Sequence, residues 1–301
     1  MSGRAVSRLW GSPIGLLLVT GGLLGLTLPF GKLAAASGIP ALLWSFVISA
    51  GAGSVLLCAL LVQKHRFVLT AHKLRYFFIA AVISYAIPNL LMFNVIPRLG
   101  AGYTGIMYTL SPAITLALSI LLGVRRPNLL GVIGIGVGFI GAITVAGTRG
   151  EAGQPAGFIW VILALLIPVS LAAGNIYRTF DWPQATGPIE LAVGSNLAAA
   201  LMLLVGIIFT DGGASFPLLA YAPLITLAQI VASAAMFAFF FRLQSVGGPV
   251  YLSQIGYVGA GIGLLSGTLF LNEHYQFLTW LGAVVIVIGV ILTTRAQTGK
   301  D

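Results

Sequence analysis

Residues 99–125 read LGAGYTGIMYTLSPAITLALSILLGVR: a glycine-rich turn, a long uncharged run, and an arginine that ends it. A helix of about 20 apolar residues, at about 1.5 Å per residue, crosses the roughly 30 Å hydrocarbon core of a bilayer. The run from residue 101 to residue 122 is long enough for this. It therefore predicts a membrane-spanning helix, with lipid rather than water as its solvent.

The composition of the whole chain agrees with this prediction. Of the 301 residues, 58% are hydrophobic and 7% are charged, and the mean hydropathy is +1.05. A soluble domain carries about 25% charged residues, so a soluble globular protein is excluded. The 39 glycines and 14 prolines lie within long apolar stretches. Transmembrane helices tolerate both residue types, which predicts positions of close packing and bending.

Dividing the chain at charges, prolines and polar clusters gives ten segments long enough to cross a bilayer. The connections between them are short, so no inserted soluble domain is expected. The fold class is an all-α integral membrane protein with ten transmembrane helices, at residues 13–33, 41–62, 75–96, 101–122, 128–146, 157–177, 188–209, 219–241, 249–270 and 276–294.

The basic residues predict the orientation of these helices. Of the 15 Lys and Arg residues, only Lys32, Arg98 and Arg149 fall on the side of the membrane opposite to the N-terminus. Cytoplasmic loops carry an excess of Lys and Arg, so both termini are expected in the cytoplasm. The formal net charge of +9 then belongs to the loops and does not indicate a nucleic-acid partner.

An internal repeat relates the two halves of the chain. LGAGY at 99–103 corresponds to VGGPV at 246–250, and LGVR at 122–125 corresponds to LNEH at 271–274; Lys32 corresponds to Arg178. We therefore expect two repeats, residues 1–150 and 151–301, of five spans each. Because five is odd, the second repeat enters the membrane from the opposite side, as in the inverted repeats of many secondary transporters.

These features resemble the EamA branch of the drug/metabolite transporter superfamily. They are five plus five spans, a Gly-Ala-Gly turn into the fourth span, Pro112 within it, and a Leu-Gly-x-Arg ending. The resemblance covers residues 12 to 295. It implies an inner-membrane carrier, often an exporter of amino acids and other small metabolites, with a central cavity. The family commonly has Glu after Leu-Gly, where this chain has Val124; the second repeat retains the acid as Glu273.

Polar side chains that recur on one helix face indicate the lining of such a cavity, because polar groups facing lipid are unfavourable. Asn89 and Gln229 are the foremost candidates, since each amide has several hydrogen-bonding groups near the middle of its span. The candidate substrate-binding residues are Tyr85, Asn89, Tyr108, Ser111, Asn175, Gln229, Ser233, Gln254 and Tyr257.

The charged residues at the ends of spans are expected to reach water or the headgroups. Glu190 and Glu273 are accordingly expected as solvated acids, and whether either takes part in proton coupling stays open. No nucleophile–base pair or metal-ligand motif lies within the spans, which predicts neither an enzyme nor a metal or cofactor site. The GxGxxG match at Gly136–Gly141 lies inside a span with no preceding strand, so it does not indicate a nucleotide site.

The sequence thus predicts an ATP-independent carrier of small neutral or zwitterionic molecules that works by alternating access in a bacterial inner membrane. A lipid flippase and a passive channel remain alternatives on the same architecture. Small residues at Ser45, Ser49 and Gly53, and from Gly134 to Ala146, predict close helix packing. The packing could be within one chain or between two, so a homo-oligomer stays open.

Overall fold

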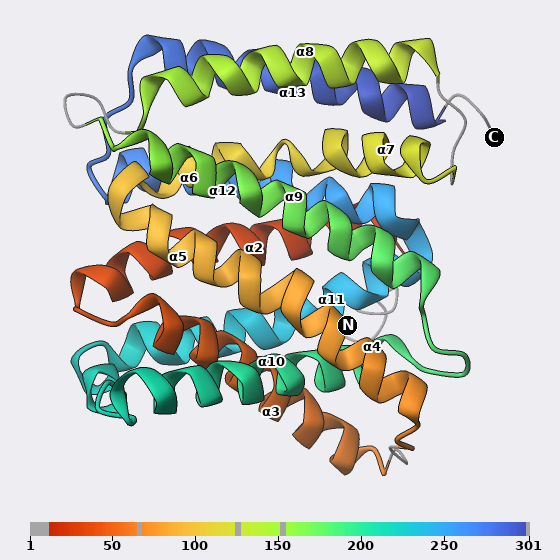
Figure 1. Ribbon diagram of the computed structural model, residues 1–301, viewed down its shortest axis with the longest axis vertical. Coiled ribbons are helices and arrows are strands. Elements are labelled where there is room, and N and C mark those ends of the chain that lie inside the picture. Colours follow the sequence, from red (N-terminus) through yellow and green to blue (C-terminus); the bar gives the residue numbers. More distant parts are fainter. Residues whose placement is uncertain (1–11, 65–67, 124–127, 151–154, 299–301) are drawn as a thin grey trace, which may run out of the picture.

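The computed structural model describes residues 12–64, 68–123, 128–150 and 155–298, and within these ranges all regular structure is helical (Figure 1). Three of the elements follow one another without a loop, since α4 continues through a π-helical segment, η1, into α5. The elements are α2 (Pro13–Ala36), α3 (Ala41–Val62), α4 (Ala71–Ala81), η1 (Val82–Ala86), α5 (Ile87–Leu99), α6 (Ala101–Tyr108), α7 (Ser111–Leu121), α8 (Leu129–Thr148), α9 (Phe158–Phe180), α10 (Pro188–Asp211), the 3₁₀ turn η2 (Phe216–Tyr221), α11 (Pro223–Ser253), α12 (Ile255–Phe270) and α13 (Phe277–Thr298).

Eight helical stretches in the described ranges are long and apolar enough to cross a membrane, each over one of the expected spans. Two shorter apolar helices, Ile255–Phe270 and Phe277–Gly289, lie on the remaining two. Large apolar side chains point outward from the bundle, with Phe209 86% exposed and Leu224 80% exposed. Water would not tolerate such a surface and lipid does, so the chain is a multi-pass membrane protein.

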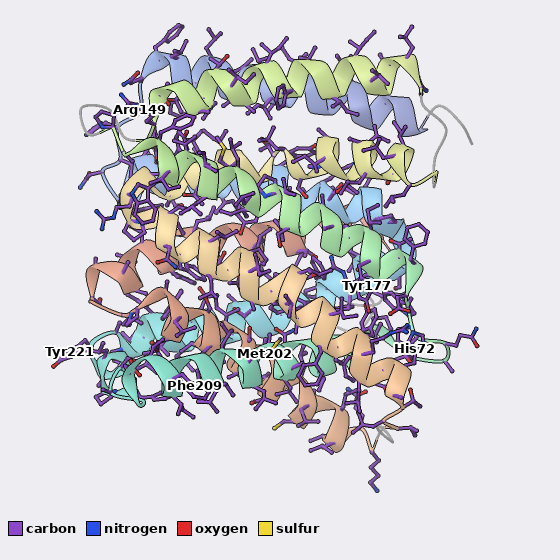
Figure 2. All side chains as sticks on the ribbon, in the orientation of Figure 1. His72, Arg149, Tyr177, Met202, Phe209 and Tyr221 are labelled. Carbon is purple, nitrogen blue, oxygen red and sulfur yellow. The ribbon has the colours of Figure 1, made fainter. Side chains whose placement is uncertain are left out.

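The helices lie side by side, with most connecting loops at the two ends of the bundle (Figure 1). His72 and Tyr177 lie at one end, and Arg149 and Tyr221 lie at the other (Figure 2). We call these the His72 end and the Arg149 end. Most of the helices therefore run between these two ends, which is the geometry that a bilayer requires.

Helices from the two halves of the chain pack against each other in matching pairs. In the middle, α2 packs on α11 and α12, while α9 packs on α5 and α7. At the lower side of Figure 1, α3 lies against α10, and at the upper side α8 lies against α13. Each of these four kinds of contact thus has a counterpart with the roles of the halves exchanged.

The regular helical backbone is interrupted at two places, one within the fourth span and one at the turn between the eighth and ninth spans. Between α6 and α7 the chain tightens at Thr109 and Leu110, whose amides bond to the carbonyls of Ile106 and Met107 three residues back. The ring of Pro112 then prevents regular helical bonding at the start of α7. Within α11 the backbone leaves the helix at Gly248, where φ is 69°, a value that glycine adopts readily. At these interruptions, backbone amide and carbonyl groups do not make the regular hydrogen bonds of an α-helix.

Glycine allows α8 and α13 to approach backbone to backbone. A Cβ atom added at Gly289 would lie 2.4 Å from the amide nitrogen of Gly138, and one at Gly282 would lie 3.0 Å from the carbonyl oxygen of Gly141. The glycine seam predicted on residues 134–146 is therefore confirmed, and it packs within one chain. The other seam is used as well, because Gly53 faces Leu197 of α10.

Replacing Gly289 with Ala should destabilise the protein, because the methyl group would meet the backbone of Gly138, which cannot move aside as a side chain can. Overpacking of this kind lowers the free energy of unfolding by about 1–3 kcal/mol. Gly136→Ala is the matched control, since a Cβ there meets nothing within 4 Å. Thermal denaturation of the detergent-solubilised protein measures both; equal midpoints for the two variants would contradict the seam.

Candidate substrate cavity

A cavity of about 60 Å³ lies in the middle of the bundle. We call it the central cavity. Elements from both halves of the chain supply its lining, which consists of Leu24, Ser84, Tyr85, Asn89, Tyr108, Ser111, Leu171, Asn175, Met236, Phe237, Phe240, Leu252, Ser253, Ile255 and Gly256.

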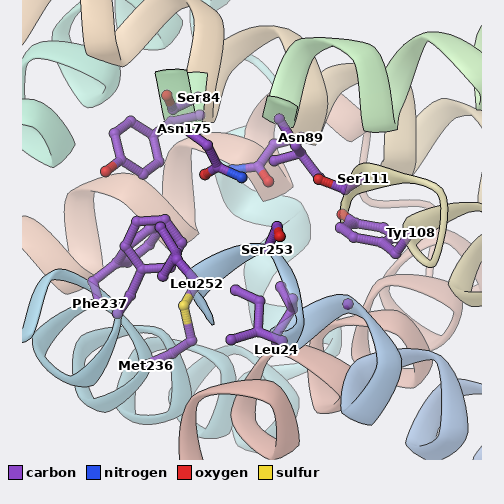
Figure 3. A pocket seen from close by; sticks show the side chains of 15 residues that line it. Leu24, Ser84, Asn89, Tyr108, Ser111, Asn175, Met236, Phe237, Leu252 and Ser253 are labelled. Carbon is purple, nitrogen blue, oxygen red and sulfur yellow. The ribbon is translucent and has the colours of Figure 1, made fainter. Parts of the chain in front are cut away.

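The lining is divided into a polar side and an apolar side. Ser84, Asn175, Asn89 and Ser111 lie along one side, and Phe237, Met236, Leu252 and Leu24 lie along the other (Figure 3). The polar side comes from η1, α5, α7 and α9, whereas the apolar side comes from α2 and α11. A molecule with one polar end and an apolar body would satisfy both sides.

The π-helical segment η1 places two residues of the polar side. One extra residue in the turn from Val82 to Ala86 rotates the following chain, so that Ser84, Tyr85 and Asn89 all reach the central cavity. π-bulges are rare and are frequent at functional sites. Within the described residues, the Tyr85 hydroxyl and the Asn89 amide nitrogen are buried and have no hydrogen-bond partner. Both can therefore donate to or bind a ligand without giving up an existing bond.

The fourth span contributes Tyr108 and Ser111 on either side of its interruption. The Tyr108 hydroxyl donates to the Met92 sulfur, 2.8 Å away. Thr104 lies four residues before Tyr108, and Thr115 lies four residues after Ser111. Their hydroxyls donate to backbone carbonyls four residues back, those of Gly100 and Ser111. These threonine hydroxyls are thus satisfied within their own helix, as Ser and Thr commonly are in membranes.

Five of the nine candidate residues line the central cavity and four do not. The structure brings together Tyr85, Asn89, Tyr108, Ser111 and Asn175. Gln229 and Ser233 are fully buried elsewhere, where the Gln229 side-chain nitrogen donates to the Ser233 hydroxyl at 2.7 Å. Gln254 forms the junction between α11 and α12, and Tyr257 lies one turn further along; neither appears in the lining. Gln229 is therefore a weaker candidate than Asn89.

Glu273 is not a solvated acid as the sequence led us to expect. Its side chain is buried, and one carboxylate oxygen accepts from the Lys32 ammonium at 2.6 Å and from the Ala101 amide at 2.7 Å. The other accepts from the Gly102 amide at 3.0 Å and from the Tyr275 hydroxyl. The carboxylate thereby caps the positive end of α6, across the two halves of the chain.

Glu190 is buried in the same way at the His72 end. The Lys73 ammonium lies 2.5 Å from its carboxylate, and the two residues are 8% and 4% exposed. The prediction of solvated acids is wrong for both glutamates because each helix end is covered by a helix from the other half. The sequence of a single span does not show which helix will cover its end.

In the described ranges no group of three His, Cys, Asp or Glu residues could hold a metal ion.

Arg178 was expected to reach the membrane surface, but it is 1% exposed. Its Nε donates to the Gln244 side-chain oxygen at 2.8 Å, one Nη donates to the Asn175 side-chain oxygen at 2.6 Å, and the other Nη donates to the Ser84 hydroxyl. The guanidinium also lies over the Phe240 ring, 4.9 Å from its centroid. Three of these neighbours, Ser84, Asn175 and Phe240, line the central cavity.

A second hollow of about 510 Å³ opens at the His72 end, and Arg178 and Gln244 are among the residues that line it. We call it the entry hollow. Its wall comes from the end of α9, the start of α10 and the last turns of α11 around Gly248, and it includes Trp182 and Arg242. Arg178 therefore separates the entry hollow from the central cavity, with hydrogen bonds to residues of both.

Sequence reasoning missed Ser84, Ser253 and Arg178. Arg178 follows Asn175 by three residues, which places both on one helix face, so the predicted role of Asn175 carried a signal for it. Ser84 directly precedes Tyr85, and in a regular α-helix the two would point about 100° apart. The π-helical geometry changes the directions of these two side chains, and no residue within the π segment predicts that geometry.

Comparison with known proteins agrees with this architecture. Residues 12–147 match the model of the EamA-like transporter family. No curated protein matches the chain. A solved structure titled "Crystal structure of protein" is 19% identical, covers 94% of this chain and 98% of its own, and superposes with a TM-score of 0.64, which shows a shared fold through both halves. Residues 12–147 are therefore similar to the EamA-like transporter family.

Proposed function

We propose that the chain is a secondary transporter of small amphipathic metabolites, and that the central cavity is its substrate site. One observation carries the proposal: a cavity with a polar side and an apolar side lies in the middle of a lipid-embedded bundle, between the two halves of the chain. Secondary transporters bind substrate near the bilayer midplane at the interface of two repeats. Tyr85, Asn89, Tyr108, Ser111 and Asn175 are the proposed polar contacts.

The matching packing of the two halves supports residues 1–150 and 151–301 as inverted repeats that work by alternating access. The entry hollow opens at the His72 end, and the charge count places that end in the cytoplasm. At the Arg149 end the Lys32–Glu273 pair joins the two halves. The proposed state is therefore open toward the cytoplasm of a bacterial cell, which suits an exporter of amino acids or related molecules in the inner membrane.

The alternative of a lipid flippase is less well supported. A crevice of about 340 Å³ does lie between α7, α8 and α9, with walls that include Leu110, Ile135 and Phe139. All of its lining residues are apolar, so it offers a lipid headgroup no polar partner during passage. A passive channel is disfavoured as well, because the hollow at the Arg149 end, beside Asn94 and Asp211, shares no lining residue with the central cavity.

Asn89→Ala should lower transport by about two- to tenfold, because a neutral hydrogen bond from this amide to the substrate contributes about 0.5–1.5 kcal/mol. The measurement is the metabolite content of the medium from cells that overproduce each variant at equal abundance in the membrane. Gln229→Ala is the control, since this amide is also in a membrane-spanning helix but is fully buried outside the central cavity.

One small class of compounds should accumulate outside cells with the wild type and with Gln229→Ala, and not with Asn89→Ala. Loss of export in the Gln229 variant alone would place the substrate elsewhere. If the metabolite content of the medium is the same for all cells, export is contradicted. Uptake, measured in proteoliposomes, would then become the proposed activity.

A further inference from the structure

The Arg178 guanidinium is a buried positive charge whose contacts are all neutral. Its hydrogen-bond partners are the amide oxygens of Gln244 and Asn175 and the Ser84 hydroxyl. Within the described residues no carboxylate lies within 4.0 Å of it. A guanidinium does not lose its proton in proteins, so the burial of this charge is not relieved by neutralisation. An anion beside Arg178 would stabilise it.

In the described part of the chain, the acids at the same end of the bundle as Arg178 are occupied by other cations. Asp181 follows it by three residues, but its carboxylate accepts from Arg75 at 2.7 Å, from Tyr177 at 2.6 Å and from His72 at 2.9 Å. Although burial raises the pKa of Asp181, these hydrogen bonds outweigh it and hold the pKa below its usual value. Glu190 is engaged by Lys73. Glu273 and Asp211 lie at the Arg149 end.

The internal repeat shows what Arg178 lacks. Its counterpart in the first half, Lys32, is neutralised by Glu273. The position that corresponds to Glu273 in the first half is Val124, which lies outside the described residues and carries no charge in any conformation. One of the two equivalent cations therefore has a carboxylate supplied by the chain, and the other does not.

Arg178 also lies where a substrate must pass. Its three hydrogen bonds leave one N–H on each Nη group, because each Nη carries two and uses one. Ser84 and Asn175 belong to the polar side of the central cavity, and Gln244 belongs to the entry hollow. A carboxylate matches the planar guanidinium in geometry and can accept two parallel bonds from it.

We infer that Arg178 binds the carboxylate of the substrate, and that the substrate is a small carboxylic acid or zwitterion with an apolar body. The body lies against Met236, Phe237 and Leu252, while the carboxylate takes over the bonds that Arg178 makes to Ser84 and Asn175. Because those bonds separate the entry hollow from the central cavity, binding also opens the way between them. The inference rests on the proposed function for the transport step, and the binding step stands without it.

The first test supplies the missing charge inside the protein. Ser84→Asp places a carboxylate against the guanidinium, and Ser84→Asn places a neutral group of the same size there. If Arg178 lacks a counter-ion, Ser84→Asp has the higher thermal midpoint of the two. A lower or equal midpoint for Ser84→Asp overturns the inference. This comparison needs no substrate and keeps Arg178 in place.

The second test uses sodium phenylacetate and phenylacetamide, which share one body and differ in the carboxylate. With ionic strength held by sodium chloride, phenylacetate should raise the thermal midpoint of the purified full chain and phenylacetamide should not. Arg178→Gln should weaken phenylacetate binding about tenfold or more, as expected for the loss of a charged hydrogen bond. Ser84→Asp should also abolish it, and Ser84→Asn should retain it.

Equal effects of the two compounds, no effect of either, or an undiminished effect in Arg178→Gln would each overturn the inference. If Arg178→Gln does not fold, the two Ser84 variants give the same decision. Transport in proteoliposomes separates the two proposals: binding without flux contradicts the proposed function and leaves the carboxylate site intact, whereas flux of phenylacetamide equal to that of phenylacetate leaves the carrier and removes the site.

Discussion

Replacing Glu273 with Gln should lower the free energy of unfolding by about 3–5 kcal/mol, the usual effect of breaking a buried ion pair. Lys32 loses the carboxylate 2.6 Å away, and one of the two amides at the start of α6 loses its acceptor. We expect a markedly lower thermal midpoint for the detergent-solubilised variant and less folded protein in the membrane. Heating followed by fluorescence-detected size-exclusion chromatography measures both.

Asp211→Asn is the matched control for Glu273→Gln. Asp211 also accepts a backbone amide, that of Gly213 at 2.8 Å, but it is exposed at the end of α10. Its replacement should change the midpoint little, because water substitutes for what is lost. A Glu273 variant as stable as this control would show that the carboxylate does not hold the two halves together.

Lys73→Met should be nearly as damaging, with a loss of about 3 kcal/mol or more, because the Glu190 carboxylate stays buried without the ammonium 2.5 Å away. The double variant Lys73→Met, Glu190→Leu should recover most of the stability. Replacing both partners of a buried pair by apolar groups is often neutral, whereas removing one strands the other.

Thermal midpoints of the two single variants and the double variant complete the cycle for this pair. A coupling near zero, or a double variant less stable than either single one, would contradict the pairing seen in the structure. It would also return Glu190 to the list of acids available for proton coupling, since its charge would then not be committed to Lys73.

Much of the fold could be predicted from the sequence because the signal is local. A bilayer requires a long apolar run for each crossing, so the ends of most spans fall within a few residues of the helices observed. The interruptions could not be predicted in the same way. Pro112 indicates a bend, but the π segment from Val82 to Ala86 has no proline or glycine inside it, and depends on how α9 and α10 pack against it.

The candidate site divides along the same line. Asn89, Tyr108 and Asn175 reach the central cavity, because a mid-membrane polar side chain generally faces the interior. Gln229 also faces the interior of the bundle, but it is packed between helices and does not line the central cavity. The burial of Arg178 could not be predicted from its position near the end of its helix. It is covered by a segment 66 residues later in the chain, which contributes Gln244.

The two-sided lining of the central cavity has a consequence for how specificity can change over generations. The groups proposed to recognise charge and polarity come from η1, α5, α7 and α9, and the groups proposed to contact the apolar body come largely from α11. Exchange of Met236 or Leu252 for a smaller or larger residue leaves Arg178, Asn175 and Asn89 untouched. The same fold can therefore acquire specificity for new substrates by single substitutions on the apolar side, while the residues that bind the polar end of the substrate stay unchanged.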